Sequence, residues 1–311
     1  MKLAILGATS QLAKDLIIRL FKNKNIILHL YSRNTANIKN WLLPFNSNDY
    51  ISKDINYFDH NGNYDAIINF IGAGNPTRIK DLGSEIIDIT YKYDNLVIEY
   101  LKKNSNCKYI FISSGAAYGD VFFDKDCSRT HSCFLIDNNN DFYGLAKYYS
   151  EVRHRALQAL KIYDLRVFGY FSSSQDIESR FILSDVYRAV RDNGVFITTN
   201  QEMIRDYIHP DDFHAMVTSL LLSDINNCAL DCYSRCPIDK KELLQTMHDE
   251  FGMKYLITES DNINNTKGRR IYYYSKNKKA SQLINFFPQY SSKDVIVSEM
   301  RKIINTQVDF K

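Results

Sequence analysis

The stretch LAILGATSQLAKDLIIRLFK, residues 3–22, begins as one kind of secondary structure and ends as another. Its first four residues are apolar and predict a buried strand, whereas the apolar residues from Leu12 onward recur with helical spacing. The segment GATSQLA, residues 7–13, therefore turns a strand into a helix. Such a turn can bring backbone N–H groups to a phosphate at the N-terminus of the helix.

The same alternation of short apolar runs and longer amphipathic ones continues through the first half of the chain. It predicts strands at residues 26–32, 49–55, 66–74, 108–115 and 163–171, and long helices at 86–103 and 143–160. Strands that alternate with helices indicate a parallel sheet covered on both faces. The predicted fold class is therefore α/β, a Rossmann doubly wound parallel sheet.

The alternation weakens after about residue 172. A helix is expected at residues 181–193, a strand at 195–199 and a helix at 211–224. We expect residues 1–172, with about 201–225 returning, to form a dinucleotide-binding Rossmann domain. Residues of about 173–200 and 226–311 are expected to form a smaller C-terminal substrate-binding lobe, which leaves a cleft at the carboxyl edge of the sheet.

The composition limits the partners and the location of the protein. The 311 residues are 45% hydrophobic and carry a net charge of +3, so a full core is expected and nucleic acid is not. No apolar run reaches the roughly eighteen residues of a membrane span, so we expect no membrane insertion. The six cysteines lack the close pairs and neighbouring histidines of zinc sites. We expect free thiols, no metal site and a cytoplasmic location.

GATSQLA resembles a dinucleotide-binding loop with few glycines. Gly7 occupies the tight turn, and Ser10 and Ala13 occupy the next two glycine positions of a G-x-x-G-x-x-G spacing. Both replacements are small, and Ser10 can also cap the helix. The alternative interpretation is a plain tight turn. The predicted cofactor contacts in this loop are Gly7, Thr9, Ser10, Gln11 and Leu12.

The end of the second strand distinguishes the two nicotinamide dinucleotides. NAD sites usually have a carboxylate there, whereas NADP sites have an arginine near the 2′-phosphate. The sequence LYSRN offers Ser32 and Arg33 and no acid, so NADP is favoured over NAD. The other interpretation of Arg33 is an ordinary surface arginine. Further cofactor contacts are predicted after the third and fourth strands, at Asp54, Ile55, Ile71, Gly72 and Ala73.

Four segments in order, GATSQLA, FISSGAAYG, YGLAK and IRDYIHPDDF, resemble the extended short-chain dehydrogenases/reductases, the sugar-nucleotide epimerase/dehydratase family. The resemblance spans nearly the whole chain. It implies that Ser114, Tyr143 and Lys147 are catalytic, while Ser113 is structural. Tyr143 and Lys147 lie one helical turn apart, and the ammonium of Lys147 is expected to lower the pKa of Tyr143. Tyr143 could then transfer a proton to or from a sugar hydroxyl.

The residues after the active-site serine bear on the reaction. Related 4,6-dehydratases carry an acid pair there, whereas this chain has Gly115 and Ala116, so the resemblance argues against dehydration. It implies an NADP-dependent 4-ketoreductase or 4-dehydrogenase of a nucleotide-diphosphate deoxyhexose or heptose, in surface polysaccharide biosynthesis. The alternatives are a nucleotide-sugar 4-epimerase with tightly bound NAD and a non-enzymatic NADP-sensing regulator.

The resemblance also implies where the substrate and a second subunit bind. Arg205 resembles the arginine that binds the nucleotide diphosphate, its alternative being a surface pair with Asp206. The tyrosines of RRIYYYSKNKK are expected in a half-buried strand rather than on a nucleic-acid surface. A homodimer is expected through a four-helix bundle of residues 86–103 and 143–161 from each subunit. The predicted substrate contacts are Ser114, Tyr118, Gly169, Arg180, Arg205 and Arg270.

Overall fold

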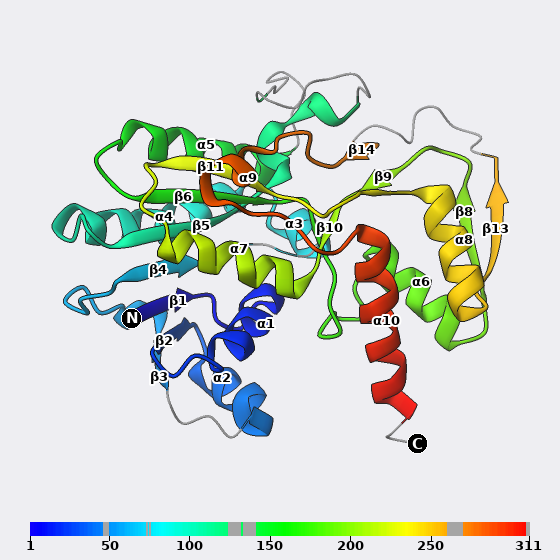
Figure 1. Ribbon diagram of the computed structural model, residues 1–311, viewed down its shortest axis with the longest axis horizontal. Helices are drawn as coiled ribbons and strands as arrows, with labels where there is room; N and C mark the ends of the chain where they lie inside the picture. Colours follow the sequence, from blue (N-terminus) through cyan, green and yellow to red (C-terminus); the bar gives the residue numbers. More distant parts are fainter. Residues whose placement is uncertain are drawn as a thin grey trace.

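A parallel sheet forms the centre of the protein, in the strand order β11-β6-β5-β4-β1-β2-β3 (Figure 1). The computed structural model describes residues 1–45, 50–72, 74, 76–123, 132, 141–259 and 270–308. The strands of this sheet are β1 (Lys2–Leu6), β2 (Ile27–Ser32), β3 (Tyr50–Asp54), β4 (Ala66–Asn69), β5 (Lys108–Ser114), β6 (Ile162–Val167) and β11 (Cys228–Cys232). The strand order reverses between β1 and β4, and ligands of such folds bind at the carboxyl ends of the strands near this point.

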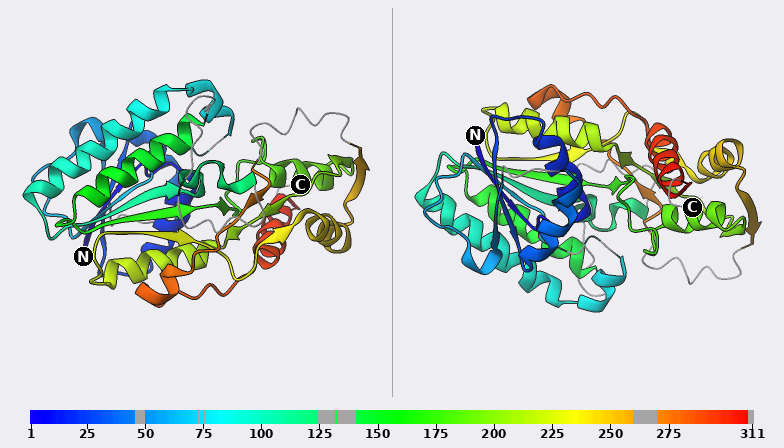
Figure 2. Two further views of the ribbon diagram at one scale, coloured as in Figure 1. Left: turned by 90° about the horizontal axis from the view of Figure 1, so that it is seen from above. Right: turned by 90° about the horizontal axis from the view of Figure 1, so that it is seen from below.

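Helices cover both faces of the sheet because successive side chains of its strands point to opposite faces. Leu3 and Ile5 of β1 belong to the core shared with α1 (Gln11–Leu20), α2 (Thr35–Leu42) and α7 (Pro210–Leu222). Ala4 and Leu6 belong to the opposite core, shared with α4 (Glu85–Lys103). The helix α5 (Phe142–Ala156) packs beside α4, as the view from above shows (Figure 2). The short helix η1 (Leu43–Phe45) lies between α2 and β3 in the chain, and the short helix α3 (Pro76–Leu82) lies between β4 and α4.

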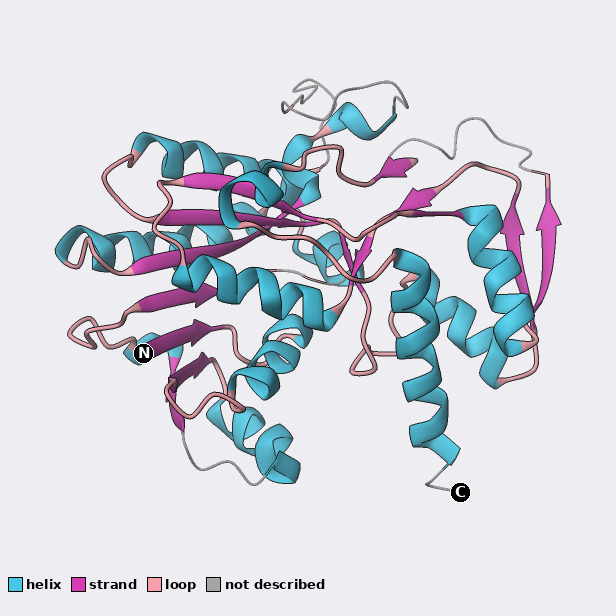
Figure 3. Cartoon of the chain, viewed as in Figure 1, coloured by secondary structure: helices cyan, strands magenta, loops and turns pink. Residues whose placement is uncertain are grey.

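A smaller group of elements follows beyond the carboxyl edge of the sheet (Figure 3). It contains α6 (Ile182–Arg191), α8 (Lys240–Phe251) and α10 (Ser292–Val308), and the parallel pair of β8 (Val195–Thr199) and β13 (Lys254–Thr258). Its core includes Val186, Leu243 and Val295. Between this lobe and the sheet, β7 (Gly169–Tyr170) pairs with β10 (Tyr207–Ile208), and β9 (Ile204–Arg205) lies between β12 (Ile238–Asp239) and β14 (Tyr272–Tyr273).

The strands and helices expected from the sequence are present, but several end early. The strand β4 ends at Asn69 because the Asn69 side chain accepts the N–H of Ile71 and turns the chain, at 2.9 Å between Oδ1 and N. The helix α5 ends at Ala156 rather than at residue 160, and Leu160 packs in the core beneath α4 instead. The strand expected at 163–171 is divided into β6 and β7.

The chain returns to the sheet more than once after the first half. Besides α7, which packs on α1, the strand β11 extends the sheet beside β6, and α9 (Lys279–Ile284) packs on β11. Both lie within residues 226–311, a range that the sequence assigned to the smaller lobe. The alternating apolar and polar residues of a short edge strand give no indication of which sheet the strand joins. No helix in the described ranges is long and apolar enough to span a membrane.

Candidate active site

The turn after β1 has the backbone geometry of a phosphate-binding loop. Gly7 has a φ of +76°, and a Cβ there would lie 3.1 Å from the backbone nitrogen of Ile71. A side chain at this position would therefore be both strained and crowded. The side chain of Ser10 caps α1 by accepting the N–H of Ala13 at 3.4 Å.

The other predicted residues of this loop have different surroundings. Thr9 is half-buried in the turn itself, and Leu12 packs against the core under α1. The amide of Gln11 donates to Oγ of Ser172 at 2.9 Å, which joins the start of α1 to the segment that leads into the smaller lobe. Gln11 thus has a partner within the protein.

The ends of β2 and β3 lie side by side. Ser32 is buried and donates to the carbonyl of Asn34 at 2.8 Å, whereas Arg33 is exposed. Asp54 is the register partner of Ser32 and caps the short helix η2 (Ile55–Tyr57) by accepting the N–H of Asn56 at 2.8 Å. Ile55 is buried behind it. The end of β2 itself has no carboxylate, but the carboxylate of Asp54 lies beside it, at the end of the neighbouring strand β3.

The turn after β4 completes this edge of the sheet. A Cβ on Gly72 would lie 3.5 Å from Nζ of Lys147, so Ile71 and Gly72 pass directly beside the catalytic candidates. The predicted contact Ala73 lies outside the described residues. A tight glycine turn, a capped helix N-terminus and a close-passing turn after β4 together fit an extended dinucleotide lying across the switch point.

Ser114, Tyr143 and Lys147 are brought together at the carboxyl end of β5. Ser114 is the last residue of β5, and its Oγ accepts the N–H of Ala116 at 3.2 Å. Tyr143 lies in the first turn of α5, which Asp141 caps by accepting the N–H of Gly144 at 3.0 Å. One turn later, Nζ of Lys147 donates to the carbonyl of Ile112 at 2.8 Å and lies 5.8 Å from the ring centre of Tyr143.

The electrostatics of this group differ from the expectation. Burial, and then the neighbouring Tyr273, raise the pKa of Tyr143 to about 12, although a hydrogen bond with Ser114 and the charge of Arg270 lower it. The expectation that the pKa of Tyr143 falls towards neutrality is wrong for this arrangement, because burial and Tyr273 outweigh the influences that lower it. Burial lowers the pKa of Lys147 itself to about 8. Near neutral pH, Tyr143 is therefore a protonated phenol.

A second tyrosine that the sequence analysis did not assign to the site faces Ser114. The hydroxyl of Tyr273 shares a hydrogen bond with Oγ of Ser114 at 3.0 Å. The Tyr273 ring packs against Phe122 and Phe168, with ring centres 4.8 and 5.3 Å away. The alternating tyrosines of the sequence predicted its strand, but nothing local indicated that β14 ends at the active-site serine.

Two of the predicted substrate arginines lie close to Tyr273. Arg205 is its register partner on β9 and donates to the carbonyls of Ile204 and Ile271 at 2.8 and 2.9 Å. The guanidinium of Arg270 lies 5.4 Å from the Tyr273 ring centre and forms an ion pair with Asp141. The third, Arg180, is exposed in the segment before α6.

Two other predicted substrate contacts are engaged in packing. Tyr118, in the short helix η3 (Gly115–Tyr118), is fully buried, and its hydroxyl donates to both oxygens of Asp231 at 3.0 and 3.1 Å. A Cβ on Gly169 would lie 2.6 Å from the carbonyl oxygen of Asp206, so β7 needs glycine there to pair with β10. These contacts explain both residues without a substrate.

The glycine that follows Ser114 also has a packing explanation. A Cβ on Gly115 would lie 2.5 Å from the ring of Phe168, and Ala116 is fully buried. The short helix η4 (Asp120–Phe123) continues this cluster. An acid pair at these two positions would therefore need a different packing. Ser113, in contrast to Ser114, points away and donates to Glu151 at 2.6 Å, as its structural role requires.

A cavity of about 460 Å³ lies in the smaller lobe, near β9 and β14. Its lining includes Thr199, Glu202, Lys240, Lys241, Tyr255 and Tyr272. Among the described residues, no group of three or more histidine, cysteine, aspartate or glutamate side chains could hold a metal ion. The described cysteines, namely Cys107, Cys228, Cys232 and Cys236, are free thiols.

Solved structures of known proteins share this fold. A UDP-glucose 4-epimerase from Thermotoga maritima, with UDP-glucose, superposes with a TM-score of 0.80 at 14% identity, over 99% of this chain and 100% of that chain. A UDP-glucuronic acid 4-epimerase from Bacillus cereus, with UDP-glucuronic acid and NAD, gives 0.79 at 17% identity over 98% and 100%. A dTDP-glucose 4,6-dehydratase from Bacillus anthracis, with NAD, gives 0.78 at 11% over 99% and 98%.

The sequence itself matches a family model, although no curated protein sequence matches it. The model is that of the NAD dependent epimerase/dehydratase family, and it covers residues 3–227. This range contains the turn at Gly7, the strand that ends at Ser114, the pair Tyr143 and Lys147, and Arg205. The chain therefore belongs to the NAD dependent epimerase/dehydratase family.

Proposed function

We propose that the protein is an NADP-dependent 4-ketoreductase, or 4-dehydrogenase, of a nucleotide-diphosphate sugar, a deoxyhexose or a heptose. The observation that carries the proposal is the convergence of Ser114, Tyr143 and Lys147 beside the turn after β4. Tyr143 is protonated near neutral pH, so it is suited to donate a proton. Reduction of a ketone at one carbon needs such a donor and no further acid.

Ser114, Tyr143 and Lys147 have different parts in the reaction. When bound, a nicotinamide dinucleotide would supply the hydride for the carbonyl carbon. Oη of Tyr143 gives its proton to the carbonyl oxygen, so the ketone becomes an alcohol and the phenol becomes a phenolate. Oγ of Ser114 donates a hydrogen bond that orients this oxygen. The ammonium of Lys147 stabilises the phenolate and can bind the ribose hydroxyls of the cofactor.

The neighbouring residues support redox chemistry over elimination of water. Elimination needs an acid and a base placed near the two carbons that lose water, and Gly115 and Ala116 offer neither. The packing of Phe168 over Gly115 leaves no room for a side chain at that position.

The surroundings of Tyr273 support a nucleotide-diphosphate sugar as substrate. Arg205 and Arg270 both lie beside Tyr273, and guanidinium groups suit a diphosphate. The cavity of about 460 Å³ near β9 offers space for further parts of the nucleotide. Two of the solved structures named above contain such substrates, UDP-glucose and UDP-glucuronic acid.

A nucleotide-sugar 4-epimerase with tightly bound NAD is the second candidate. The same three catalytic side chains would oxidise C4 and then reduce it from the other face. The solved 4-epimerase structures favour this candidate, because one of them contains NAD. It predicts turnover without added cofactor, whereas a ketoreductase consumes NADPH.

We also propose a cytoplasmic homodimer that acts in surface polysaccharide biosynthesis. Large side chains are exposed on the outer surface of α4 and α5, where Tyr91, Tyr148, Tyr149 and Val152 are each 38–49% exposed. An exposed apolar surface of this kind is typical of an interface. Two copies packed through this surface would form a four-helix bundle.

The proposed reaction is tested by mixing the protein with NADPH and a set of 4-keto sugar nucleotides and following NADPH absorbance. Consumption of NADPH that depends on the keto sugar, with a reduced sugar nucleotide detected by mass spectrometry, is the expected result. Interconversion of C4 epimers without added cofactor would replace the first candidate with the second.

Arg33→Ala tests the choice of cofactor. Arg33 is exposed at the end of β2, where it can reach a 2′-phosphate. The loss of charge-assisted hydrogen bonds is expected to weaken NADPH binding about tenfold and leave NADH binding within about twofold. Calorimetric titration of both dinucleotides measures this, and Lys39→Ala on the exposed part of α2 is the control. Equal losses for the two dinucleotides would contradict the assignment.

Tyr273→Phe tests the second tyrosine of the site. The change removes the hydrogen bond to Ser114 and also one of the influences that raise the pKa of Tyr143. We expect kcat/KM to fall about two- to tenfold, and the limb of the pH–rate profile that reports Tyr143 to move to lower pH. A profile identical to that of the unchanged protein would show that Tyr273 only packs.

A further inference from the structure

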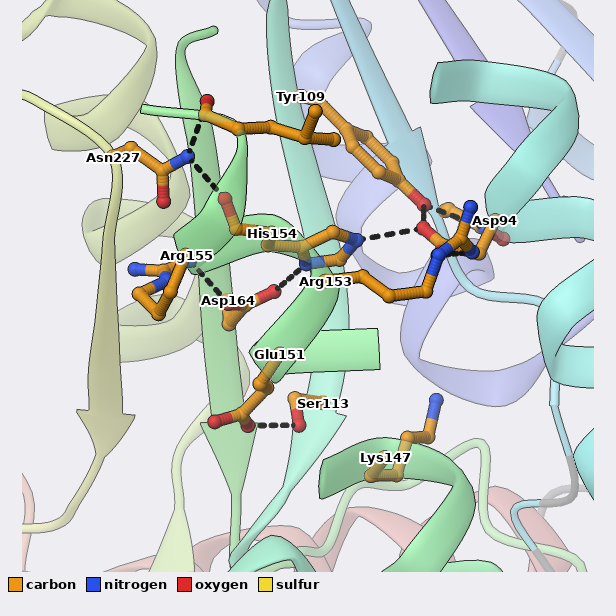
Figure 4. A network of polar contacts seen from close by, with 12 residues as sticks. Asp94, Tyr109, Ser113, Lys147, Glu151, Arg153, His154, Arg155, Asp164 and Asn227 are labelled. Carbon is orange, nitrogen blue, oxygen red and sulfur yellow. Dashed lines mark hydrogen bonds and ion pairs between the residues drawn. The ribbon is translucent and has the colours of Figure 1, made fainter. Parts of the chain in front are cut away.

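A buried cluster of charged residues lies between the sheet and α5, the helix that contains Tyr143 and Lys147 (Figure 4). His154 of α5 is fully buried between two carboxylates, with Nε2 at 2.8 Å from Asp94 of α4 and Nδ1 at 2.6 Å from Asp164 of β6. Burial lowers the pKa of His154, but the two carboxylates outweigh it and raise that pKa to about 10. The group is therefore a buried Asp–imidazolium–Asp triad near neutral pH.

Further charges border the triad on each element packed against it. Arg153 donates to Oδ2 of Asp94 at 2.9 Å. Arg155 donates to Oδ2 of Asp164 at 2.5 Å. On the same helix, Glu151 is paired with Arg166 of β6 at 2.5 Å. Other titratable neighbours include Tyr109 of β5, Lys147 of α5 and Cys228 of β11.

One arm of the triad reaches the turn that follows β4. A carboxylate only accepts hydrogen bonds, so Tyr109 must donate its hydroxyl proton to Asp94, at 3.1 Å. The Tyr109 oxygen then accepts from the amide nitrogen of Asn69 at 3.0 Å. This fixes the Asn69 amide so that its oxygen accepts the N–H of Ile71 at 2.9 Å. Each bond has one permitted direction, and donation runs from the backbone N–H of the turn, through Asn69 and Tyr109, to the buried carboxylate.

The other arm reaches Lys147. The ring of Phe111 lies between the two groups, 4.4 Å from Nζ of Lys147 and 5.2 Å from the His154 ring, centre to centre. Burial lowers the pKa of Lys147, while the charges of Asp94, Glu151 and Asp164 oppose this shift. The carboxylates of the triad thus act on the charge of Lys147 without touching it.

We propose that Asp94, His154 and Asp164 form a positioning centre for the active site, one that holds the Ile71–Gly72 turn in place and keeps Lys147 charged. His154 bridges two buried carboxylates, and Asp94 is the residue through which both arms act. That the turn and Lys147 contact a cofactor rests on the proposed function. The positioning itself does not, and neither measurement below uses a cofactor.

Tyr109→Phe interrupts the first arm and leaves the ring in place. The matched control is Tyr163→Phe, because Tyr163 is a buried tyrosine of β6 whose hydroxyl donates to the carbonyl of Ile225 at 3.0 Å. Hydrogen exchange at the Ile71 amide is expected to be about fivefold faster, or more, in Tyr109→Phe than in the control. Equal rates in the two variants would overturn the proposal.

Asp94→Asn and His154→Gln test the second arm, because they are expected to shift the titration of Lys147 in opposite directions. Loss of the carboxylate should move the titration of Lys147 to lower pH, whereas loss of the imidazolium should move it to higher pH, each by about half a pH unit or more. The titration is followed by NMR of protein with ¹³C-labelled lysine, with Lys147→Arg to assign the signal. If the triad had a purely structural role, the titration of Lys147 would shift in the same direction in both variants, and that result would overturn the proposal. Should either variant fail to fold, the exchange rates at Ile71 decide alone.

Discussion

Tyr143→Phe is expected to lower kcat about 10²- to 10⁴-fold while dinucleotide affinity stays nearly unchanged. The phenol of Tyr143 has a hydrogen bond with Ser114 and is the proposed proton donor to the carbonyl oxygen, and phenylalanine keeps its ring and its packing. The measurement compares steady-state rates with the dissociation constant of NADPH. Because a lost proton donor affects only the transition state, kcat should fall without a matching change in KM.

The control for this substitution lies on the same helix. Tyr149 is 47% exposed on the outer surface of α5, and Tyr149→Phe is expected to keep full activity. Retained activity in Tyr143→Phe would refute the assignment of Tyr143 as the proton donor. Tyr273, whose hydroxyl is hydrogen-bonded to Ser114, would then be the next candidate for the donor.

Arg166→Met is expected to produce the largest loss of stability, about 3–5 kcal/mol in the free energy of unfolding. Arg166 bonds to both oxygens of Glu151, at 2.5–3.0 Å, and lies 3.6 Å from Asp231. Methionine fills a similar volume but removes the guanidinium that pairs with two buried carboxylates. Thermal or denaturant unfolding near neutral pH measures the loss.

The loss should shrink at low pH. Burial already raises the pKa of Asp231 to about 6, and without Arg166 this pKa should rise further. A raised pKa means that Asp231 binds its proton more tightly in the folded variant than in the unfolded chain. The contribution of Asp231 to stability is therefore most favourable at low pH and is lost as pH rises through that pKa. Arg235→Met, which breaks an exposed pair with Asp294, is the control and should cost less than about 1 kcal/mol. Equal losses for the two variants would contradict a buried network.

The local part of the site could be predicted from the sequence because its signals are short in range. The turn at Gly7, the cap at Ser10 and the helical spacing of Tyr143 and Lys147 depend on neighbouring residues. The assignment of Ser114 rather than Ser113 to the active site rests on the resemblance to the family, and the bond from Ser113 to Glu151 agrees with it.

The parts that the sequence missed depend on tertiary contacts. Tyr273 lies 159 residues from Ser114, and only the pairing of β14 with β9 brings it there. Likewise, Asp94, His154 and Asp164 appear in the sequence as ordinary polar residues of two helices and a strand. Their burial, which alters the pKa of His154, follows from the packing of α4 against α5. Gly169 differs from these residues, because the sequence assigned it to the substrate site whereas its close contact with the backbone of Asp206 explains the glycine.

The identity of the dinucleotide that the purified protein releases on denaturation distinguishes an NADP-dependent reductase from an epimerase. Mass spectrometry determines this identity and the molar ratio of dinucleotide to chain. A reductase that takes up NADPH for each turnover should release little dinucleotide, and what it releases should be NADP(H). One equivalent of NAD(H) for each chain would contradict the account, because it would remove the role of Arg33 and indicate an epimerase that recycles its own cofactor.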